Sequence, residues 1–431
     1  MIKIVWVLIL LLNLALSQQI LTAENAIKTA LENNYSIQIA RNNAEIAENN
    51  AGLGTAGFLP RLDATASKSY SVTDEKTNSQ FSFGNRDTEQ LLAQLALSWT
   101  IFDGFSMFAS KSRFDALSRL GEAQSRLTIE NTVVTVLAAY FNVVQQQQLY
   151  EINKNNLQLS RERLEKEKVR KEMGGISSTD FLRSQVAFNA DSSVLLQSQL
   201  NLLTAKNTIN TLLARDLKTP FEVSSEITVP VHNRTDEEWL KLALERNALI
   251  KTSKANLLAA EKNITINTAS FYPRISLSGA YNYTDRLVTA AGREITTDAK
   301  DKSIGLNVSF NLFNGFRDNI TRQNAILEER NKQLELQQTE LQVKAALEES
   351  MINFENRMKV LSLERQNVEA ATRSFEVQKE RYQIGTTTSL DFRDAQISLN
   401  RSQVSYIAAQ YQARIAILEL EQLAGIIEIS Y

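Results

Sequence analysis

The sequence is poor in the residues that build disulfides, metal sites and loops. Its 431 residues include no cysteine, one histidine, 4 prolines and 14 glycines. The absence of cysteine excludes disulfides, thiolate metal ligands and a lipidated N-terminal cysteine. The single histidine, His232, lies close to Pro230 and is expected to be an exposed loop residue. So few prolines and glycines favour long, uninterrupted helices.

The sequence also lacks a strong net charge and the motifs of common catalytic sites. The formal net charge is −2 at pH 7, which gives no reason to expect a nucleic-acid partner. There is no HExxH metal motif, no phosphate-binding loop and no cysteine–histidine pair. We therefore expect no enzyme activity, no cofactor and no metal site.

A short apolar segment at the N-terminus predicts export. Residues 1–17 resemble a secretory signal peptide, with Lys3 at the positive end and an apolar stretch over 4–12. The apolar run is too short for a membrane-spanning helix, and Asn13 interrupts it. Because no later stretch reaches about 18 apolar residues, the exported chain is expected to have no helical anchor.

The most informative feature that is present is an internal repeat. Three segments occur twice in the same order, namely 58–62 and 271–275, 98–105 and 309–316, and 170–181 and 381–392. The predicted organisation is a signal peptide (1–17), repeat 1 (18–220), a linker (221–234), repeat 2 (235–427) and a short tail (428–431). A unit of strands and long helices has thus been duplicated, and neither copy can bury its faces alone.

Each repeat contains a pair of predicted strands. They lie at about 61–73 and 90–102 in repeat 1, and at about 274–285 and 302–313 in repeat 2. Apolar residues alternate with serine, asparagine and threonine, most clearly from Ile275 to Thr284. The polar stretches 73–89 and 285–302 are expected to be exposed loops. Such strands suit a lipid-facing β-barrel, although a strand pair packed on a soluble core shows the same alternation.

Each strand pair is followed by a long helix and a return helix. These are predicted at about 105–173 and 178–215 in repeat 1, and at about 316–384 and 389–425 in repeat 2. Apolar residues recur at every seventh position, from Ile129 to Leu164 and from Leu347 to Tyr382. Sustained heptads predict helices that lie side by side and supercoil. Each long helix measures on the order of 100 Å at 1.5 Å per residue.

Each repeat also begins with shorter helices. Thr22 is a candidate N-cap, and the Thr-Asp-Glu-Glu segment 235–238 is a candidate capping box. A second short helix is expected at about 36–56 and at about 249–269, because a proline follows each segment and disfavours helix before it.

Four strands per chain cannot form a membrane barrel alone. Every strand edge in a bilayer must be paired, and the smallest membrane barrels have about eight strands. Several chains must therefore share one barrel, and three chains would supply twelve strands. The predicted fold class is a mixture of α and membrane β, with long helices hanging from one rim of the shared barrel.

The ordered motifs resemble the TolC family of outer-membrane efflux proteins. The resemblance rests on the Leu-Thr-x-x-x-Ala-Ile segment from Leu21, on the Phe-x-Pro-Arg turns and on the Phe-Asp-Gly and Phe-Asn-Gly strand exits. Most specific are the helix–helix turns at 173–181 and 381–395, and the likeness spans residues 20–427. It implies a homotrimer with a shared 12-stranded β-barrel in outer-membrane lipid and a long periplasmic coiled-coil α-barrel.

The resemblance also implies a function and partners. The chain would be the exit duct of a tripartite efflux pump or a type I secretion system, located in the outer membrane with a large periplasmic portion. A periplasmic adaptor (membrane fusion) protein and an inner-membrane pump or ABC secretion transporter would supply its substrates, which it would conduct passively. The alternative is a secreted structural or adhesive coiled-coil protein without a pore.

The candidate gate lies at the second helix–helix turn. Asp391 and Asp394 are three residues apart at a helix start, so both can point to one side. The resemblance implies that in a trimer they form carboxylate rings at the entrance constriction, where they would favour cations and allow block by multivalent cations. The alternative is that both aspartates stabilise the helix N-terminus, with Ser389 as the cap.

Two further gate residues come from the resemblance. It implies that Tyr382 contacts Asp180 in the closed state, although Tyr382 also lies on the heptad face and packing alone would explain it. Thr387 stands where the best-known members have a tip arginine, so the latch is expected to differ or be weaker. The first repeat has Arg183 in the position of Asp394, which assigns the gate to the second repeat.

The turns and the strand ends carry the remaining candidate residues. Gly174 and Gly385 fit turns that need a positive φ between antiparallel helices. The resemblance implies that the turns contact the adaptor, through Gly174, Gly175, Gly385, Thr386 and Thr387. The candidate aromatic residues of the membrane interface are Trp99, Phe102, Phe105, Tyr281, Tyr283, Phe310 and Phe313.

Overall fold

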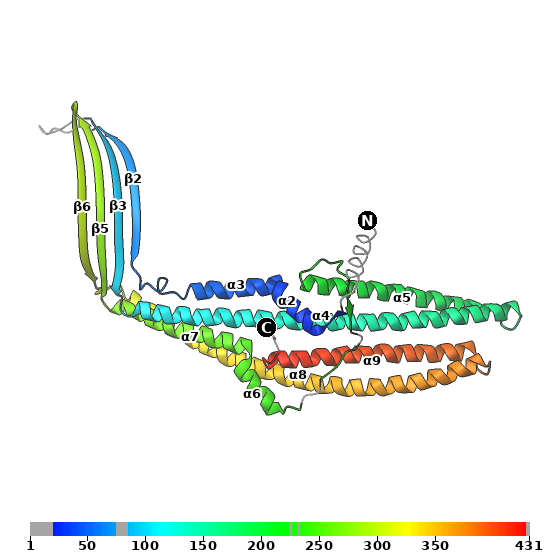
Figure 1. Ribbon diagram of the computed structural model, residues 1–431. Coiled ribbons are helices and arrows are strands. Elements are labelled where there is room, and N and C mark those ends of the chain that lie inside the picture. Colours follow the sequence, from blue (N-terminus) through cyan, green and yellow to red (C-terminus); the bar gives the residue numbers. More distant parts are fainter. Residues whose placement is uncertain (1–19, 75–84, 225, 231–232, 428–431) are drawn as a thin grey trace, which may run out of the picture. The chain divides into compact units, whose positions relative to one another are not determined.

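The computed structural model describes residues 20–74, 85–224, 226–230 and 233–427. Its contacts divide the chain into two units (Figure 1). The sheet unit comprises Asn43–Glu122 and Lys251–Gln338, and the helical unit comprises the chain up to Asn42, Ala123–Ile250 and the chain from Thr339. The predicted signal peptide, the tail 428–431 and His232 lie outside the described residues.

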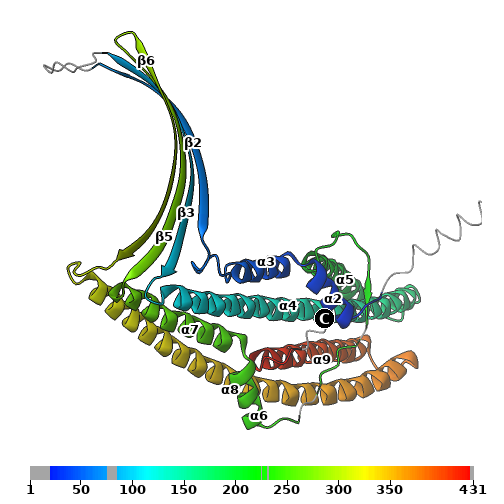
Figure 2. The ribbon, with the colours of Figure 1, turned by 60° about the vertical axis from the view of Figure 1, so that its left-hand side comes forward.

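The sheet unit contains an antiparallel four-stranded sheet. Its strands are β2 (Arg61–Thr73), β3 (Arg86–Phe102), β5 (Arg274–Ala290) and β6 (Arg293–Ser309). Their order is β2-β3-β5-β6, so the hairpins of the two repeats pair with each other through β3 and β5. Figure 2 shows the four strands curving together. The sheet does not close on itself, and β2 and β6 are its open edges.

The strand register gives the sheet one apolar band. Residues paired directly across antiparallel strands share a face. One row of the band is Leu62, Leu97, Gly279 and Ile304, and the next is Trp99, Leu277 and Leu306. On β6 the band ends at Ile304, because Lys302 and Lys300 follow on the same face. On the other strands it continues as far as the row of Lys68, Leu91 and Asp285. Ile304 is 81% exposed, so this band is uncovered within the described chain.

The second hairpin is longer than its polarity predicted. The stretch 285–302, expected to be a loop, is strand almost throughout, because β5 continues to Ala290 and β6 begins at Arg293. Ala291 and Gly292 have φ of 49° and 74°, and positive φ at both turn residues matches the twist of the flanking strands. The expectation was wrong because ladder hydrogen bonds join backbone groups and do not require apolar side chains.

Two other strand ends differ from the expected ones. β3 begins at Arg86 rather than near 90, and β6 ends at Ser309 rather than near 313. Phe310 and Phe313 therefore follow the strand instead of belonging to it. There the chain turns toward the next helix, with Gly315 and Phe316 at φ of 71° and 64°.

Helices account for most of the remaining described chain. They are α2 (Ala23–Asn33), α3 (Tyr35–Asn49), α4 (Ser106–Glu172), α5 (Ser178–Leu212), α6 (Asp236–Arg246), α7 (Ala248–Thr268), α8 (Arg317–Gln383) and α9 (Ser389–Leu423). Thr22 caps α2, and Thr235 with Glu238 forms a capping box on α6, as predicted. α3 ends at Asn49 instead of near 56, because turns containing three glycines follow it.

The helical unit is built from two hairpins, α4 with α5 and α8 with α9 (Figure 1). The heptad residues Ile129, Val136 and Val143 of α4 are 5% exposed or less and belong to a core shared with α2 and α5.

One 18-residue window of α4 has a mean hydropathy of 1.4 and could cross a membrane by length and composition, which the sequence analysis did not predict. Because 56% of that window is buried inside the chain, packing accounts for its apolarity.

The duplication extends to a pair of buried asparagines. Asn34 and Asn247 each accept hydrogen bonds from two backbone amides at the start of α3 and α7. Their Nδ2 atoms donate to the carbonyls of Leu212 and Leu423, at 2.8 and 2.9 Å. Each repeat therefore ties the end of its return helix to its own opening helices.

Candidate functional site at the helix turns

The turns between the helices of each hairpin have the same geometry. Gly174 and Gly385 have φ of 70° and 80°. The residue after each glycine donates its amide to the carbonyl of Arg170 or Arg381, at 2.7 and 2.9 Å. A Cβ atom at either glycine would meet no atom within 4 Å, so backbone conformation rather than crowding favours glycine. The predicted positive φ is confirmed.

Asp391 is part of a capping box at the start of α9. The N-cap is Thr388, one residue before the expected Ser389. Oδ2 of Asp391 accepts from the Thr388 amide and hydroxyl at 3.3 and 2.6 Å, and from the Thr387 hydroxyl at 3.1 Å. These bonds, the Thr388 hydroxyl first, hold the pKa of the Asp391 carboxyl below its usual range. The carboxylate therefore stabilises the helix start and stays ionised at neutral pH.

Asp394 lies one turn farther along α9 and has a different environment. Its side chain is exposed. Within the described chain it forms no hydrogen bond or ion pair, so the helix start does not depend on it. In the first repeat, Arg183 occupies the matching position and lies 3.9 Å from Asp180. The two repeats therefore present different charges at their turns.

Tyr382 joins the two hairpins. It is 5% exposed and stacks on Phe392 with ring centroids 4.8 Å apart. Its hydroxyl donates to Oε1 of Glu167 on α4 at 2.6 Å, not to Asp180 as the resemblance implied. Asp180 instead accepts from Ser177 at 2.8 Å within its own helix start. Burial and then the bond to Glu167 raise the pKa of Tyr382, so its hydroxyl remains a donor.

Lysine and arginine side chains surround this contact. Glu167 is 1% exposed and lies 3.6 Å from Arg170. The ammonium of Lys166 donates to the Tyr382 carbonyl at 3.0 Å and lies 4.3 Å from the Tyr382 ring centroid. α4 thus holds the end of α8 through a buried hydrogen bond and a cation–π contact.

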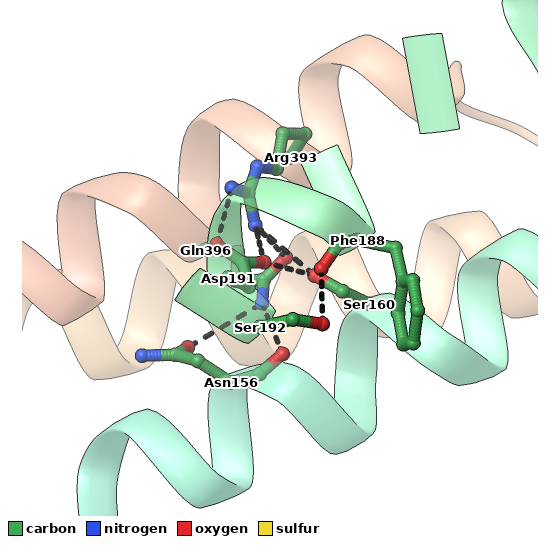
Figure 3. A network of polar contacts seen from close by, with 7 residues as sticks. All are labelled: Asn156, Ser160, Phe188, Asp191, Ser192, Arg393 and Gln396. Carbon is green, nitrogen blue, oxygen red and sulfur yellow. Dashed lines mark hydrogen bonds and ion pairs between the residues drawn. The ribbon is translucent and has the colours of Figure 1, made fainter. Parts of the chain in front are cut away.

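A second polar contact between the hairpins lies farther from the turns (Figure 3). Arg393 of α9 donates two hydrogen bonds to Asp191 of α5, at 2.7 and 2.8 Å, and the side chains are 19% and 16% exposed. Ser160 of α4 donates to Asp191 and accepts from Arg393. Gln396 accepts from Arg393 at 3.1 Å and donates to the Asn156 carbonyl at 3.2 Å.

Sequence reasoning missed this network. The heptad predicted apolar residues on the facing sides of the helices, whereas these side chains are polar. A signal was present in the spacing, since Ser160, Arg163 and Glu167 recur at helical intervals on one face of α4. All three are 3% exposed or less. Polar residues at core-facing positions are therefore the feature that marks the contact.

Arg163 is the least satisfied charge in the network. It is 3% exposed, and its Nε and Nη1 atoms have no hydrogen-bond partner among the described residues. Burial and then Arg393 lower its pKa, while Asp191, Tyr382 and Glu167 raise it. The network borders a cavity of about 190 Å³ whose walls include Asn153, Asp191 and Arg401.

The candidate interface aromatics lie in two groups along the apolar band. Tyr281 and Tyr283 lie opposite Lys302 and Lys300, with each ammonium 5.8 Å from the ring centroid. Nearer the helices, Trp99 donates to the Phe58 carbonyl at 2.9 Å. The aromatic residues around the strand exits pack edge to face, with centroids 5.3 Å apart for Phe102 and Phe105 and 5.4 Å apart for Phe313 and Phe316. Phe310 is 54% exposed.

The described residues contain no group of three or more histidine, cysteine, aspartate or glutamate side chains that could hold a metal ion. Apart from that of the exposed Asp394, the carboxylates of the turns and of the network, namely those of Asp180, Asp391, Asp191 and Glu167, face hydroxyls, guanidinium groups and a backbone amide. The geometry therefore serves helix capping and helix–helix contact.

Comparison with known proteins identifies the family. The model of the family described as outer membrane efflux protein matches residues 26–215 and 239–426, one segment in each repeat. The chain is 21% identical over 406 residues to the outer membrane efflux protein BepC of Brucella suis biovar 1, covering 94% of this chain and 85% of BepC. It is 24% identical over 293 residues to the alkaline protease secretion protein AprF of Pseudomonas aeruginosa, covering 66% and 60%.

Solved structures show the same fold. The CmeC outer membrane channel of Campylobacter jejuni superposes with a TM-score of 0.78 at 16% identity, covering 94% of this chain and 85% of CmeC. The matched family segments include both helical hairpins, and both repeats have the strand hairpin and long helices of this fold. The chain therefore belongs to the TolC family of outer membrane efflux proteins and is a non-enzymatic outer-membrane channel protein.

Proposed function

We propose that the chain forms the exit duct of a tripartite efflux pump or a type I secretion system as a homotrimer. The observation that carries this proposal is a sheet with an uncovered apolar band and two open edges. In a bilayer both edges must be paired, so other chains have to supply the neighbouring strands. Members of the TolC family act as trimers, and three copies of this sheet make a barrel of 12 strands.

The dimensions of the apolar band support a membrane position. From Ile275 to Tyr283 it spans about 27 Å along β5 at 3.4 Å per residue. Lipid-facing bands of such barrels are about 25 Å tall and are bordered by aromatic residues. Tyr281 and Tyr283 border the band on one side, and Trp99, Phe102, Phe105, Phe310 and Phe313 lie toward the other. We assign these aromatics to the two membrane interfaces.

The entrance of the proposed duct lies at the helix turns. In a trimer, Asp391 and Asp394 form two carboxylate rings, six charges in all, and their focused negative potential attracts cations. The capping bonds support this role for Asp391 because they keep its carboxylate ionised. The absence of a local partner supports it for Asp394, whose charge the helix does not use. Tyr382 and Asp180 belong to the wall beside this entrance.

The turns also form the proposed contact with the partner proteins. Gly174, Gly175, Gly385, Thr386 and Thr387 are the turn residues that would contact a periplasmic adaptor. The adaptor would link the duct to an inner-membrane pump or an ABC secretion transporter. Among the relatives, the name of BepC refers to efflux and that of AprF to protease secretion. The channel itself conducts passively, because energy enters at the inner-membrane partner.

Reconstitution tests the proposal. The purified chain should require detergent for extraction, migrate as three copies and produce conductance steps in planar lipid bilayers. A water-soluble monomer without conductance would contradict it, and is the result that a secreted adhesive coiled coil predicts. A strand-deleted variant lacking residues 274–309 is the matched control and should neither insert nor conduct.

A further inference from the structure

The strands of the sheet continue beyond the apolar band, away from the helices. Because α4 follows β3 and α8 follows β6, the helices attach at the opposite ends of these strands. Beyond the row that contains Leu91 and Asp285, the ladder continues as far as the row of Arg86, Ala290 and Arg293. We call these last rows the collar. Successive residues of a strand point to opposite faces, so the collar has one face that continues the band and one that does not.

Positive and negative charges lie on opposite faces of the collar. Arg86 and Arg293 share the row of Ala290, and Arg286 lies four residues before Ala290 on β5, so all three arginines are on the face opposite the band. The charged residues on the other face of the collar are all acidic, namely Asp87, Glu89 and Glu294. Charges that served solubility alone would not need to be sorted in this way.

The three arginines are accessible and carry free charges. Arg286 and Arg293 are exposed, and Arg86 is half-buried. Among the described residues, none of the three side chains forms a hydrogen bond or an ion pair. In the ladder rows of this face the nearest acid is Asp301, opposite Asn282, which lies about 14 Å along β5 from Arg286.

The acids of the opposite face differ in this respect. Tyr70 donates to Asp87 at 3.2 Å, and Lys68 lies 4.0 Å from Glu89. Two of the three acids therefore have partners within the sheet, whereas the arginines have none among the described residues. The unpaired positive charge of the collar lies on one face.

In the proposed trimer this face lines the exit of the duct. The apolar band faces lipid, so the opposite face of the sheet faces the lumen, and the collar lies at the end remote from the helices. Three copies with three arginines each place nine arginines around the opening. We propose that these arginines form a binding site for multivalent anions, namely solutes that carry several phosphate or carboxylate groups. The inference rests on the proposed function, because only the trimer closes the ring.

The dimensions of a 12-stranded barrel suit such a site. Strands about 4.8 Å apart and tilted by about 40° give a circumference of about 75 Å, and so a diameter of about 24 Å between backbones. The Debye length is about 8 Å at physiological ionic strength, and the long arginine side chains extend into the opening. An anion in the exit therefore lies within the field of several arginines at once.

The residue type also favours anions with several charged groups. The guanidinium group binds phosphate and carboxylate through two parallel hydrogen bonds. A monovalent anion engages one such group, whereas a multivalent anion engages several whose contacts reinforce one another. The exit is therefore opposite in sign to the carboxylates proposed at the entrance.

Block by inorganic tripolyphosphate in planar bilayers tests the site. The helical unit stays in the chamber to which the protein is added, so the exit faces the opposite chamber. Tripolyphosphate in that opposite chamber should reduce the current at a lower concentration than in the chamber of addition. In the variant with Arg86→Gln, Arg286→Gln and Arg293→Gln, the half-blocking concentration should rise about tenfold or more, because the charge-assisted contacts are lost.

The sheet offers a matched control. Lys300 and Lys302 are also positive and also lie on β6, but on the face of the band. The variant with Lys300→Gln and Lys302→Gln should therefore be blocked as strongly as the wild type. Replacing the three arginines with lysine keeps the charge but not the paired hydrogen bonds, so its half-blocking concentration should lie between those of the wild type and the glutamine variant.

Three results would overturn the anion site alone. The first is a wild type that conducts without block from the exit side. The second is a glutamine variant that conducts and is blocked as strongly as the wild type. The third is equal relief of block by the two lysine substitutions, because the charge would then act regardless of its face. Absence of conductance from the wild type would overturn the duct and the anion site with it.

Discussion

Asp391 and Asp394 show how two like residues at one helix start can serve different purposes. Asp391 accepts three hydrogen bonds on Oδ2, whereas Asp394 is exposed without a local partner. The sequence alone offered a capping role and a ring role as alternatives for both. For Asp391 the two roles are compatible, since a cap on one carboxylate oxygen leaves its charge in place. Asp394 has no structural role in the described chain to compete with the ring.

The first prediction concerns block of the channel by multivalent cations. Replacing Asp391 and Asp394 together with alanine removes six carboxylates from the proposed trimeric entrance. We expect the half-blocking concentration of a trivalent cation to rise about tenfold or more, which corresponds to about 1.4 kcal/mol of lost binding. Glu355→Ala, an exposed carboxylate midway along α8, is the control and should leave block unchanged. If the double variant conducts and is blocked as strongly as the wild type, the assignment of Asp391 and Asp394 to the carboxylate rings is wrong.

The pH dependence of this block follows from the capping box. In an Asp394→Ala variant the remaining ring is Asp391, whose pKa is lowered by Thr388 and Thr387. A lowered folded-state pKa keeps the cap bonds and the charge present above the unfolded value of about 3.9. Both are lost only as the pH falls through the lower folded-state pKa. Cation block measured against pH should therefore persist to below about pH 4. Loss of block near pH 6 would argue against Asp391 as the blocking group.

The helices and strands differ in how well their local pattern predicts them. The heptads predicted the long helices at about 105–173 and 316–384, and α4 and α8 span Ser106–Glu172 and Arg317–Gln383. Their ends coincide with glycines at positive φ, which local sequence marks clearly. The prediction of a loop at 285–302 was wrong, because the charged residues there belong to the ends of β5 and β6. A β-ladder forms through backbone groups, so strands extend beyond the apolar band.

The buried asparagines Asn34 and Asn247 are predicted to contribute to the stability of the helical unit. Asn247→Ala removes hydrogen bonds to Leu249, Ile250 and Leu423 at a site that is 5% exposed. We expect a loss of about 2–3 kcal/mol of stability, because a helix cap disappears and a buried carbonyl loses its donor. Denaturant unfolding followed by circular dichroism measures it.

The repeat supplies the matched variant. Asn34→Ala should cost a similar amount, because Asn34 makes the same set of contacts in the first copy. Asn43→Ala, an exposed asparagine on α3, is the control and should be nearly neutral. If Asn247→Ala unfolds at the same denaturant concentration as Asn43→Ala, the hydrogen bonds between the return helix and the opening helices contribute little to stability.

The open edges of the sheet are explained by the assembly of several copies. Among the described residues β2 pairs only with β3 and β6 only with β5, so each has one open edge, while β3 and β5 are paired on both sides. In the proposed trimer, β2 of one copy pairs with β6 of the next. A cysteine at Ala66 in β2, combined with cysteines scanned over Lys300–Leu306 in β6, should form intermolecular disulfides at matching positions.

The products of this scan distinguish a closed ring from other assemblies. Oxidised samples should contain linked dimers and trimers and nothing larger, because three copies close the ring. Ala93→Cys in place of the β2 cysteine is the control, since β3 is central in the sheet and should not cross-link. Products beyond trimers would indicate an open array, and an absence of products at every position would contradict the shared barrel.

The sequence pattern alone was sufficient to predict the repeat, the long helices, the turn glycines and the apolar strands, because each of these features depends on residue spacing within one segment. The choice of partners depended on tertiary structure. A heptad shows which side of a helix is covered but not which residue lies opposite, because the axial register between helices distant in sequence is a property of the whole packing. For this reason Tyr382 bonds to Glu167 and not to Asp180, and Arg393 finds Asp191. The same holds for the pairing of β3 with β5, which joins the two copies of the repeat into one sheet.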